Sequence, residues 1–270
     1  MTRSGIAAWR LLRCVLHALH GLAIVLWRFG ALDAAGRQAR IRWWSRKMLQ
    51  TLGITLQVEG EPAPAGTRGV LLVANHISWL DVMAVHAVVP QARFVSKADV
   101  KSWPVISRLV DAAGTLYLER ERKRDALRVV HAVAEALIDG QTVAVFPEGT
   151  TSDGRGLLPF HANLLQAAIA AEAQVQPVAL RFSDADGPVS RAVEFIGTTT
   201  LAQSLWRTAG GERVTVRVAL LPARPAAHVD RRALAQSLRE AIADALGVDP
   251  GDRAAPPAAV PTPAPELAQG

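Results

Sequence analysis

The chain has 270 residues, a formal net charge of +6 and one cysteine, Cys14. This length suits one large domain with appendages or two small domains, and it allows a substantial buried core. A single cysteine excludes an internal disulfide framework and is compatible with a reducing compartment.

The basic charge is concentrated in the first 53 residues, which carry nine Lys or Arg residues and one acidic residue. Residues 54–270 have a net charge of −2, so they have the nearly neutral composition of an ordinary globular domain. Four of the seven tryptophans also lie in the N-terminal segment. Basic side chains beside aromatic ones favour an anionic membrane surface as the partner, and we expect no nucleic-acid binding.

Two helices are predicted in this basic segment, over residues 9–29 and roughly 38–52. The uncharged part of the first runs from Cys14 to Trp27, which is ~21 Å and shorter than a ~30 Å hydrocarbon core. The second carries apolar side chains on one face and basic ones on the other. We interpret them as a pair that dips into one leaflet; a true spanning helix and a soluble helical hairpin are the alternatives.

From Ile54 onward, short apolar runs alternate with helical patterns. The runs that predict strands are 54–58, 69–74, 93–96, 115–118, 142–146, 175–181, 192–196 and 213–220. The patterns that predict helices are 79–89, 103–112, 122–139, 160–171 and 230–246, the last with Asp230 as N-cap and Gly247 at its end. This alternation indicates an α/β fold with a mixed, largely parallel sheet flanked by helices.

The chain therefore divides into a membrane-associated helical pair (1–53), a globular domain (54–248) and a tail (249–270). The tail is rich in Pro and Ala and has no periodicity, so we expect it to be disordered.

Residues 75–81 read Asn-His-Ile-Ser-Trp-Leu-Asp and follow the apolar run 70–74, which predicts a buried strand. On one continuous helix, His76 and Asp81 would lie about 140° apart and could not share a face. They meet only if His76 lies in the turn after the strand and Asp81 in the first turn of the next helix. The junction of a strand end and a helix is where α/β folds place reactive groups.

Two cations follow neighbouring strands. The stretch 114–120 ends in the pair Glu119 and Arg120, and Lys97 ends the run before it. A guanidinium offers donors in a planar fork that suits a phosphate, whereas the alternative for both cations is a solvated surface position.

Residues 146–154, Phe-Pro-Glu-Gly-Thr-Thr-Ser-Asp-Gly, follow another apolar strand. Glycines and small hydroxyl residues after a strand free backbone N–H groups to face an anion. Glu148 in this loop is a candidate acceptor for substrate hydroxyls or for backbone donors. Residues 176–178, Gln-Pro-Val, open a further strand and fit a pocket wall or the core equally well.

Several other chemistries are not supported by the sequence. It contains neither a phosphate-binding loop ending in Gly-Lys-Ser/Thr nor a Gly-x-Ser-x-Gly nucleophile elbow. The remaining histidines show no metal-ligand spacing with Cys or carboxylates, and we predict no metal site.

Taken in order, residues 75–81, 114–120, 146–150 and 176–178 resemble the four sequence blocks of the glycerolipid acyltransferase family, the 1-acylglycerol-3-phosphate acyltransferases and their relatives. The match extends over roughly residues 55–220. The resemblance implies transfer of an acyl chain from acyl-CoA or acyl-carrier protein to a lysolipid hydroxyl, with no other cofactor. It also implies attachment, through the N-terminal helices, to the cytoplasmic face of the inner membrane.

The same resemblance implies roles for individual residues. His76 would be the general base and Asp81 the group that orients its imidazole. The phosphate of the acceptor would be held by Lys97 and Arg120. Its glycerol side would be lined by Glu148, Gly149 and Thr150.

The chain departs from the phosphatidate-forming pattern at three positions. Thr151 stands where many of those members have Arg, and His161 and Asn163 stand where Lys and Gly are frequent. From the overall resemblance we expect 1-acylglycerol-3-phosphate as acceptor. The three departures make lyso-ornithine lipid or another lysolipid the enzymatic alternative. A non-catalytic membrane-surface binding protein is the alternative of a different class.

Overall fold

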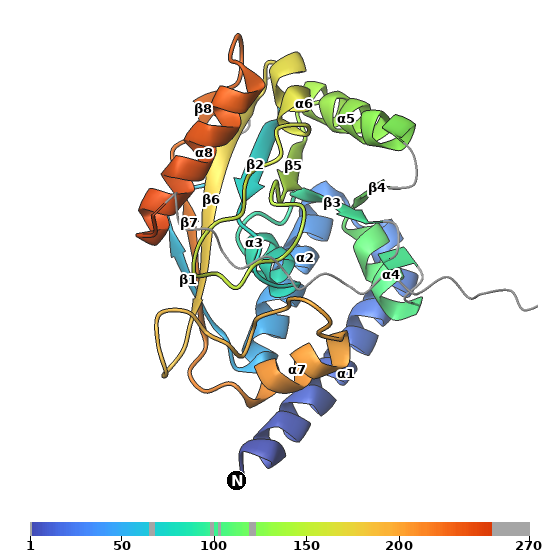
Figure 1. The fold of residues 1–270 in the computed structure, drawn as a ribbon. Coiled ribbons are helices and arrows are strands. Elements are labelled where there is room, and N and C mark those ends of the chain that lie inside the picture. Colours follow the sequence, from blue (N-terminus) through green and yellow to red (C-terminus); the bar gives the residue numbers. More distant parts are fainter. Residues whose placement is uncertain (1, 65–67, 98–99, 102–103, 119–122, 250–270) are drawn as a thin grey trace, which may run out of the picture.

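A computed structural model describes residues 2–64, 68–97, 100–101, 104–118 and 123–249 (Figure 1). The helices are α1 (Arg3–Trp27), α2 (Ala34–Leu52), α3 (Leu80–His86), α4 (Pro104–Ala112), α5 (Lys123–Ile138), α6 (Leu165–Ala170), α7 (Leu201–Gly210) and α8 (Arg231–Leu246), with a 3₁₀ turn at Phe29–Ala31. The strands are β1 (Thr55–Glu59), β2 (Val70–Ala74), β3 (Arg93–Lys97), β4 (Leu116–Leu118), β5 (Thr142–Val145), β6 (Gln174–Ser183), β7 (Thr215–Leu220) and β8 (Arg224–Pro225).

The strands form one mixed sheet in the order β1-β7-β6-β2-β5-β3-β4, with β8 paired to β6. All neighbours along this path are parallel except β6 and β7, and β8 is also antiparallel to β6. The predicted fold class, a largely parallel sheet flanked by helices, is confirmed. The parallel pairing of β2 with β5 and β6 sets three loops side by side at the carboxyl edge of the sheet.

Helices cover both faces of the sheet (Figure 1). In β2, Leu71 and Val73 pack into a cluster with α5, α6 and α8, whereas Leu72 and Ala74 pack into a second cluster with α1, α2, α3 and α7. This period of two is the one expected for a strand buried on both faces. β2 therefore runs through the centre of the domain.

The N-terminal helices are longer than the sequence pattern predicted. α1 begins at Arg3, and α2 begins after Asp33, whose side chain accepts the Gly36 N–H as an N-cap. Their buried residues share the core cluster of the sheet, notably Met48, Leu49 and Leu52 of α2. The helical pair is thus packed into the globular core on one side.

The opposite side of α1 is exposed and apolar. Its large exposed side chains are Trp9, Leu12, Val15, Leu16, Leu19, Leu26 and Trp27. Within the described part of the chain, α1 is the helix whose length and composition would allow it to cross a membrane. We call these seven residues the α1 apolar face.

The C-terminal half differs from the sequence predictions in two places. Residues 192–196 form no strand, because the carbonyls of Ala192, Glu194 and Phe195 accept hydrogen bonds from side chains instead of from a neighbouring strand. Helix α7 was not predicted, although a capping box between Thr200 and Gln203 starts it. The tail from residue 250 lies outside the described residues, so its disorder stays a prediction.

Candidate active site

The candidate site lies in the turn between β2 and α3. As the main chain leaves β2, the buried side chain of Asn75 continues the ladder: its Nδ2 donates to the Leu180 carbonyl at 2.9 Å and its Oδ1 accepts the Leu180 N–H at 2.8 Å. This pair fixes the end of β2 against β6. The turn that follows therefore starts from a rigid point.

His76 and Asp81 meet across this turn, as the spacing predicted. Their Nδ1 and Oδ2 atoms are 2.7 Å apart, with Asp81 in the first turn of α3 and fully buried. The same Oδ2 accepts the backbone N–H groups of Ile77 at 2.7 Å and Ser78 at 2.9 Å. Asp81 thus shapes the turn as well as orienting the imidazole.

The imidazole of His76 presents its second nitrogen for chemistry. Because a carboxylate only accepts hydrogen bonds, Nδ1 carries the hydrogen and Nε2 carries the lone pair. The side chain is 20% exposed, and Nε2 has no hydrogen-bond partner within the described residues. The ring stacks on Phe146 at a centroid distance of 4.0 Å, and Phe146 stacks on Phe94 at 5.5 Å. These contacts hold a base whose free nitrogen is accessible.

Glu148 lies in the loop after β5 and reaches beneath His76. Its Oε1 accepts the His76 N–H at 2.7 Å, and its Oε2 accepts the Leu158 N–H at 2.9 Å. The residue is only 3% exposed. Burial raises the pKa of the Glu148 carboxyl to about 8, while the two N–H donors act in the opposite direction. Of the two roles considered for Glu148, these contacts are those of an acceptor for backbone donors; contact with substrate stays a prediction.

Ser152, from the same loop, holds the other side of the His76 peptide and was missed by the sequence analysis. Its N–H donates to the His76 carbonyl at 2.8 Å, and its hydroxyl approaches the same oxygen at 3.2 Å. Ser152 is fully buried. Together Glu148 and Ser152 fix the main chain of His76 on both sides. The feature that could have pointed to Ser152 is that its loop follows β5, which lies parallel to β2.

Comparisons with known proteins agree with this geometry. Residues 55–181 match the family model described as Acyltransferase. A 1-acyl-sn-glycerol-3-phosphate acyltransferase of Neisseria meningitidis is 42% identical over 198 residues, which cover 73% of this chain and 76% of that relative. This chain belongs to the glycerolipid acyltransferase family.

Two further proteins resemble this chain. A lyso-ornithine lipid O-acyltransferase of Pseudomonas aeruginosa is 37% identical over 210 residues, covering 78% of this chain and 79% of that protein. The crystal structure of a 1-acyl-sn-glycerophosphate acyltransferase from Thermotoga maritima has a TM-score of 0.65 at 20% identity, covering 88% of this chain and 96% of that one. The solved structure shows a shared fold.

The other predicted binding residues of this acyltransferase are placed unevenly. Gly149, at φ +70°, and the half-buried Thr150 continue the loop that carries Glu148, so β5 brings them to the edge where His76 lies. A Cβ on Gly149 would lie 3.3 Å from the His161 ring. Lys97 ends β3, but its side chain lies outside the described part, as does all of Arg120. Their proposed contacts with phosphate stay predictions.

Gln176 and Thr151 are engaged within the protein. The buried Gln176 amide accepts the Ala63 N–H at 2.9 Å and donates to the carbonyls of Glu61 and Leu221, so it fastens the segment between β1 and β2. The Thr151 hydroxyl donates to the Phe195 carbonyl. Thr151 thus anchors the loop after β5 to the segment that contains Phe195.

No cluster of three His, Cys, Asp or Glu residues that could hold a metal ion occurs among the residues that the structure describes.

The buried His86 shows how another histidine of the acyltransferase is used. Its Nε2 lies 2.9 Å from the Ala92 carbonyl, and burial lowers its pKa to about 4. It is a core residue whose hydrogen bond is made within the fold.

Proposed function

We propose that this acyltransferase is a membrane-bound lysolipid O-acyltransferase that converts 1-acylglycerol-3-phosphate to phosphatidic acid. The observation that carries the proposal is the His76–Asp81 pair, whose Nε2 is accessible while Nδ1 is fixed. The relative from Neisseria meningitidis, at 42% identity, bears the name of this activity.

In the proposed reaction, Nε2 of His76 takes the proton of the acceptor hydroxyl as the oxygen attacks the thioester carbonyl. The buried carboxylate of Asp81 stabilises the imidazolium that forms. The tetrahedral intermediate then collapses, the carbon–sulfur bond breaks, and the imidazolium returns the proton to the leaving thiolate. The new ester and the free thiol balance the reaction, so the chain needs no metal or redox cofactor.

The oxyanion of that intermediate needs hydrogen-bond donors. The N–H groups of Ile77 and Ser78 lie in the catalytic turn, but both are bound to Asp81. The Ser152 N–H is likewise bound to the His76 carbonyl. These three N–H groups are therefore already engaged within the protein and are not assigned to the oxyanion.

We also propose that α1 enters one leaflet of the membrane and does not span the bilayer. One side of α1 packs on the domain through Ala7, Cys14, His17 and Gly21, which recur at helical spacing over most of its length. A helix held in this way would carry its neighbours into the hydrocarbon if it crossed the bilayer. The α1 apolar face then enters one leaflet, and the remaining domain sits at its surface, on the cytoplasmic side of the inner membrane.

Acylation of lyso-ornithine lipid is the second candidate. Two observations favour it: Thr151 supplies no cation, and its hydroxyl is bound to the Phe195 carbonyl. The Pseudomonas aeruginosa relative, at 37% identity, carries that name.

An acceptor panel tests the proposal. Purified full-length protein in detergent receives labelled acyl-CoA or acyl-carrier protein together with 1-acylglycerol-3-phosphate, lysophosphatidylcholine or lyso-ornithine lipid. We expect the fastest turnover with 1-acylglycerol-3-phosphate. Turnover confined to the phosphate-free acceptor would establish the second candidate, and no turnover with any acceptor would contradict both.

A further inference from the structure

Helix α7 supports the catalytic turn from its buried side. The indole N–H of Trp79, in the turn between His76 and Asp81, donates to the hydroxyl of Ser204 at 3.1 Å. Ser204 is fully buried, and so is Thr208 one turn later, whose hydroxyl donates to the Ala192 carbonyl at 3.1 Å. The position of the catalytic turn is thus tied to α7 by a side-chain hydrogen bond.

The C-terminal end of α7 is tied to α1. One nitrogen of Arg10 donates to the carbonyls of Ala209 at 2.9 Å and Gly211 at 2.8 Å. Ala209 is buried in the same core cluster as Ala7 and Cys14 of α1. This arrangement satisfies carbonyls at the helix end with a cation, which also suits the helix dipole. We therefore treat α1 and α7 as one rigid unit.

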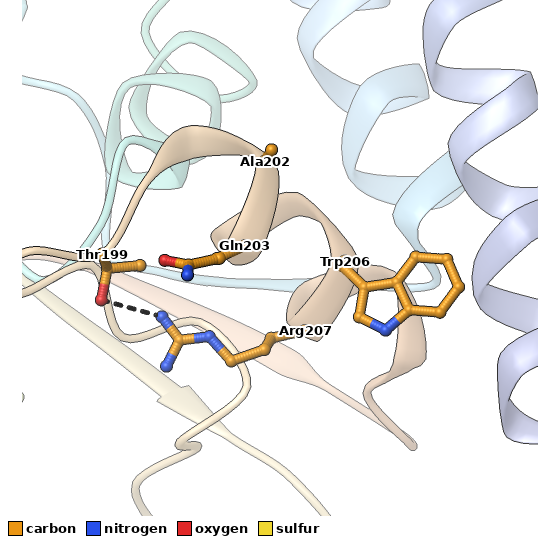
Figure 2. A pocket seen from close by; sticks show the side chains of 5 residues that line it. All are labelled: Thr199, Ala202, Gln203, Trp206 and Arg207. Carbon is orange, nitrogen blue, oxygen red and sulfur yellow. Dashed lines mark hydrogen bonds between the residues drawn. The ribbon is translucent and has the colours of Figure 1, made fainter.

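The outer side of α7 combines an exposed indole with a guanidinium (Figure 2). Trp206 is 48% exposed and points toward the side on which α1 runs, whereas Arg207 points back to Thr199. These side chains and those of Ala202 and Gln203 line a shallow hollow of about 610 Å³. We call these five residues the α7 hollow.

The charge at the α7 hollow is available to an anion. Nη2 of Arg207 donates to the Glu194 carbonyl and the Thr199 hydroxyl, both at 3.1 Å, while Nε and Nη1 have no partner in the described part of the chain. The nearby carboxylate of Glu194 is paired with Arg155 at 3.1 Å, and that of Glu212 is paired with Arg3 at 2.8 Å. The neighbouring acids are therefore neutralised, and Arg207 keeps donors for a ligand.

We propose that the α7 hollow is a second membrane contact, beside the α1 apolar face, in which Arg207 binds the phosphate of an anionic phospholipid and Trp206 lies at headgroup level. This inference rests on the proposed membrane-bound function. A bilayer is the occupant that fits, because α7 is fixed to α1, whose apolar face carries its own tryptophans. Indoles and basic side chains are the pair that membrane interfaces favour. Through Ser204 and Trp79, this contact sets the height of His76 above the lipid.

Site-specific labelling tests the contact directly. Cys14 is buried, so a thiol introduced by Trp206→Cys is selectively labelled with an environment-sensitive fluorophore. On vesicles containing phosphatidylglycerol we expect a blue shift at 206 and at Leu16→Cys on α1, but none at Leu127→Cys on α5, across the sheet. A shift at 16 without one at 206 would overturn the inference, and so would no shift at either.

Affinity measurements test the chemistry. We expect Trp206→Ala to weaken binding to phosphatidylglycerol vesicles about tenfold and Arg207→Gln about fivefold, the latter being the effect of one basic residue near an anionic surface. The Arg207→Gln effect should vanish on phosphatidylcholine vesicles, and Leu127→Ala should bind like wild type. Equal losses on both vesicle types for Arg207→Gln would contradict a contact that depends on the net negative charge of the lipid.

Activity separates this inference from the proposed function. For Trp206→Ala we expect a fall in the ratio of turnover with vesicle-borne lysolipid to turnover with detergent-dispersed lysolipid. An unchanged ratio would overturn the role of α7 in placing the catalytic turn. Failure of the wild type to acylate any lysolipid in detergent would instead contradict the proposed function. The affinity for vesicles would still be measurable, so the membrane contact could be tested separately.

Discussion

At the scale of single residues, the accessible Nε2 of His76 is the atom on which the proposed reaction depends. The main chain around it is held by Glu148 and Ser152, and neither contact uses the imidazole. We therefore expect His76→Ala to fold normally and to lose at least ~100-fold in initial rate of acyl transfer, the low end for loss of a general base. The exposed His131 on α5 offers the matched control, because His131→Ala should retain full rate.

An unchanged rate in His76→Ala would mean that His76 is not the general base of the reaction. Loss of rate together with an altered thermal unfolding midpoint would point to a folding defect. The comparison with His131→Ala therefore needs both measurements.

Glu148 predicts a pH dependence of stability. Its folded-state pKa, about 8, lies above the ordinary value of 4.5 for a Glu carboxyl, so its contribution is fully present below pH 4.5 and is lost as pH rises toward 8. We expect wild type to lose stability relative to Glu148→Gln across this window, by on the order of a few kcal/mol. Thermal unfolding of both proteins at pH 5, 6.5 and 8.5 measures this. A difference that does not vary with pH would show that Glu148 does not titrate there.

Local spacing predicted the His76–Asp81 contact because both residues belong to one turn, and the length of that turn limits where they can lie. The contacts of Glu148 and Ser152 with His76 span more than 70 residues. They depend on which strand lies beside β2, and no local pattern encodes that choice. Sequence therefore predicted the contact between His76 and Asp81, while the groups that hold this pair became visible only with the sheet order.

At the scale of helices, α1 and α2 are joined by a reciprocal contact. The Trp44 indole N–H donates to the His17 carbonyl at 3.2 Å, and Nε2 of His17 lies 3.0 Å from the Trp44 carbonyl. The two rings also stack at 5.4 Å. Gly21 makes room for the indole, since a Cβ there would lie 2.3 Å from the Trp44 nitrogen.

This close approach reverses the usual effect of replacing glycine in a helix. Alanine normally stabilises a helix interior by ~1 kcal/mol, but overpacking costs about 1–3 kcal/mol. We expect Gly21→Ala to lower the free energy of unfolding, measured by denaturant titration in detergent. Gly30→Ala, where no atom lies within 4 Å of the new Cβ, should show no such loss. A neutral or stabilised Gly21→Ala would mean that the indole moves aside at little cost.

The segment from residue 192 to the end of α7 was the least predictable, whereas β7 and α8 after it were predicted closely. Residues 192–196 alternate like a strand, and Val193 is indeed buried, but their carbonyls are bound by Thr151, Arg207 and Thr208. Burial without a neighbouring edge produces the same pattern as a strand. Helix α7 carried a capping signal at Thr200 and Gln203, yet its short length leaves few turns in which periodicity can appear.

At the scale of the whole molecule, the α1 apolar face is the surface for which we propose a lipid environment. Leu12, Leu16 and Leu19 are each about half exposed, so replacing them removes no core. We expect the triple change of these residues to Gln to weaken vesicle binding on the order of 100-fold, from ~1 kcal/mol for each half-exposed side chain. Sedimentation with vesicles measures this, with Leu127→Gln on α5 as the control. Undiminished binding would place the anchor elsewhere.

Deleting residues 1–52 tests membrane attachment less cleanly than the triple substitution on α1 does. The deletion would remove the buried side chains of Met48, Leu49 and Leu52 and expose the sheet residues packed on them. We expect the truncated chain to aggregate, as judged by size-exclusion chromatography in detergent. A soluble, monomeric product would show that residues 54–248 form a separate domain, as the sequence composition suggested.

The bond between Arg10 and the carbonyl of Ala209 also has a consequence for biogenesis. The partners are 199 residues apart in the sequence. Strand β1 likewise cannot form its pairing until β7 has been synthesised. At ~5–20 residues per second, a ribosome needs roughly 10–40 s to supply the missing partners. Throughout that interval α1 has α2 beside it but lacks α7 against its inner side, and its outer side is apolar. We expect the nascent helix to reach the bilayer before the rest of the domain is made, so that translation delivers the enzyme to its lipid.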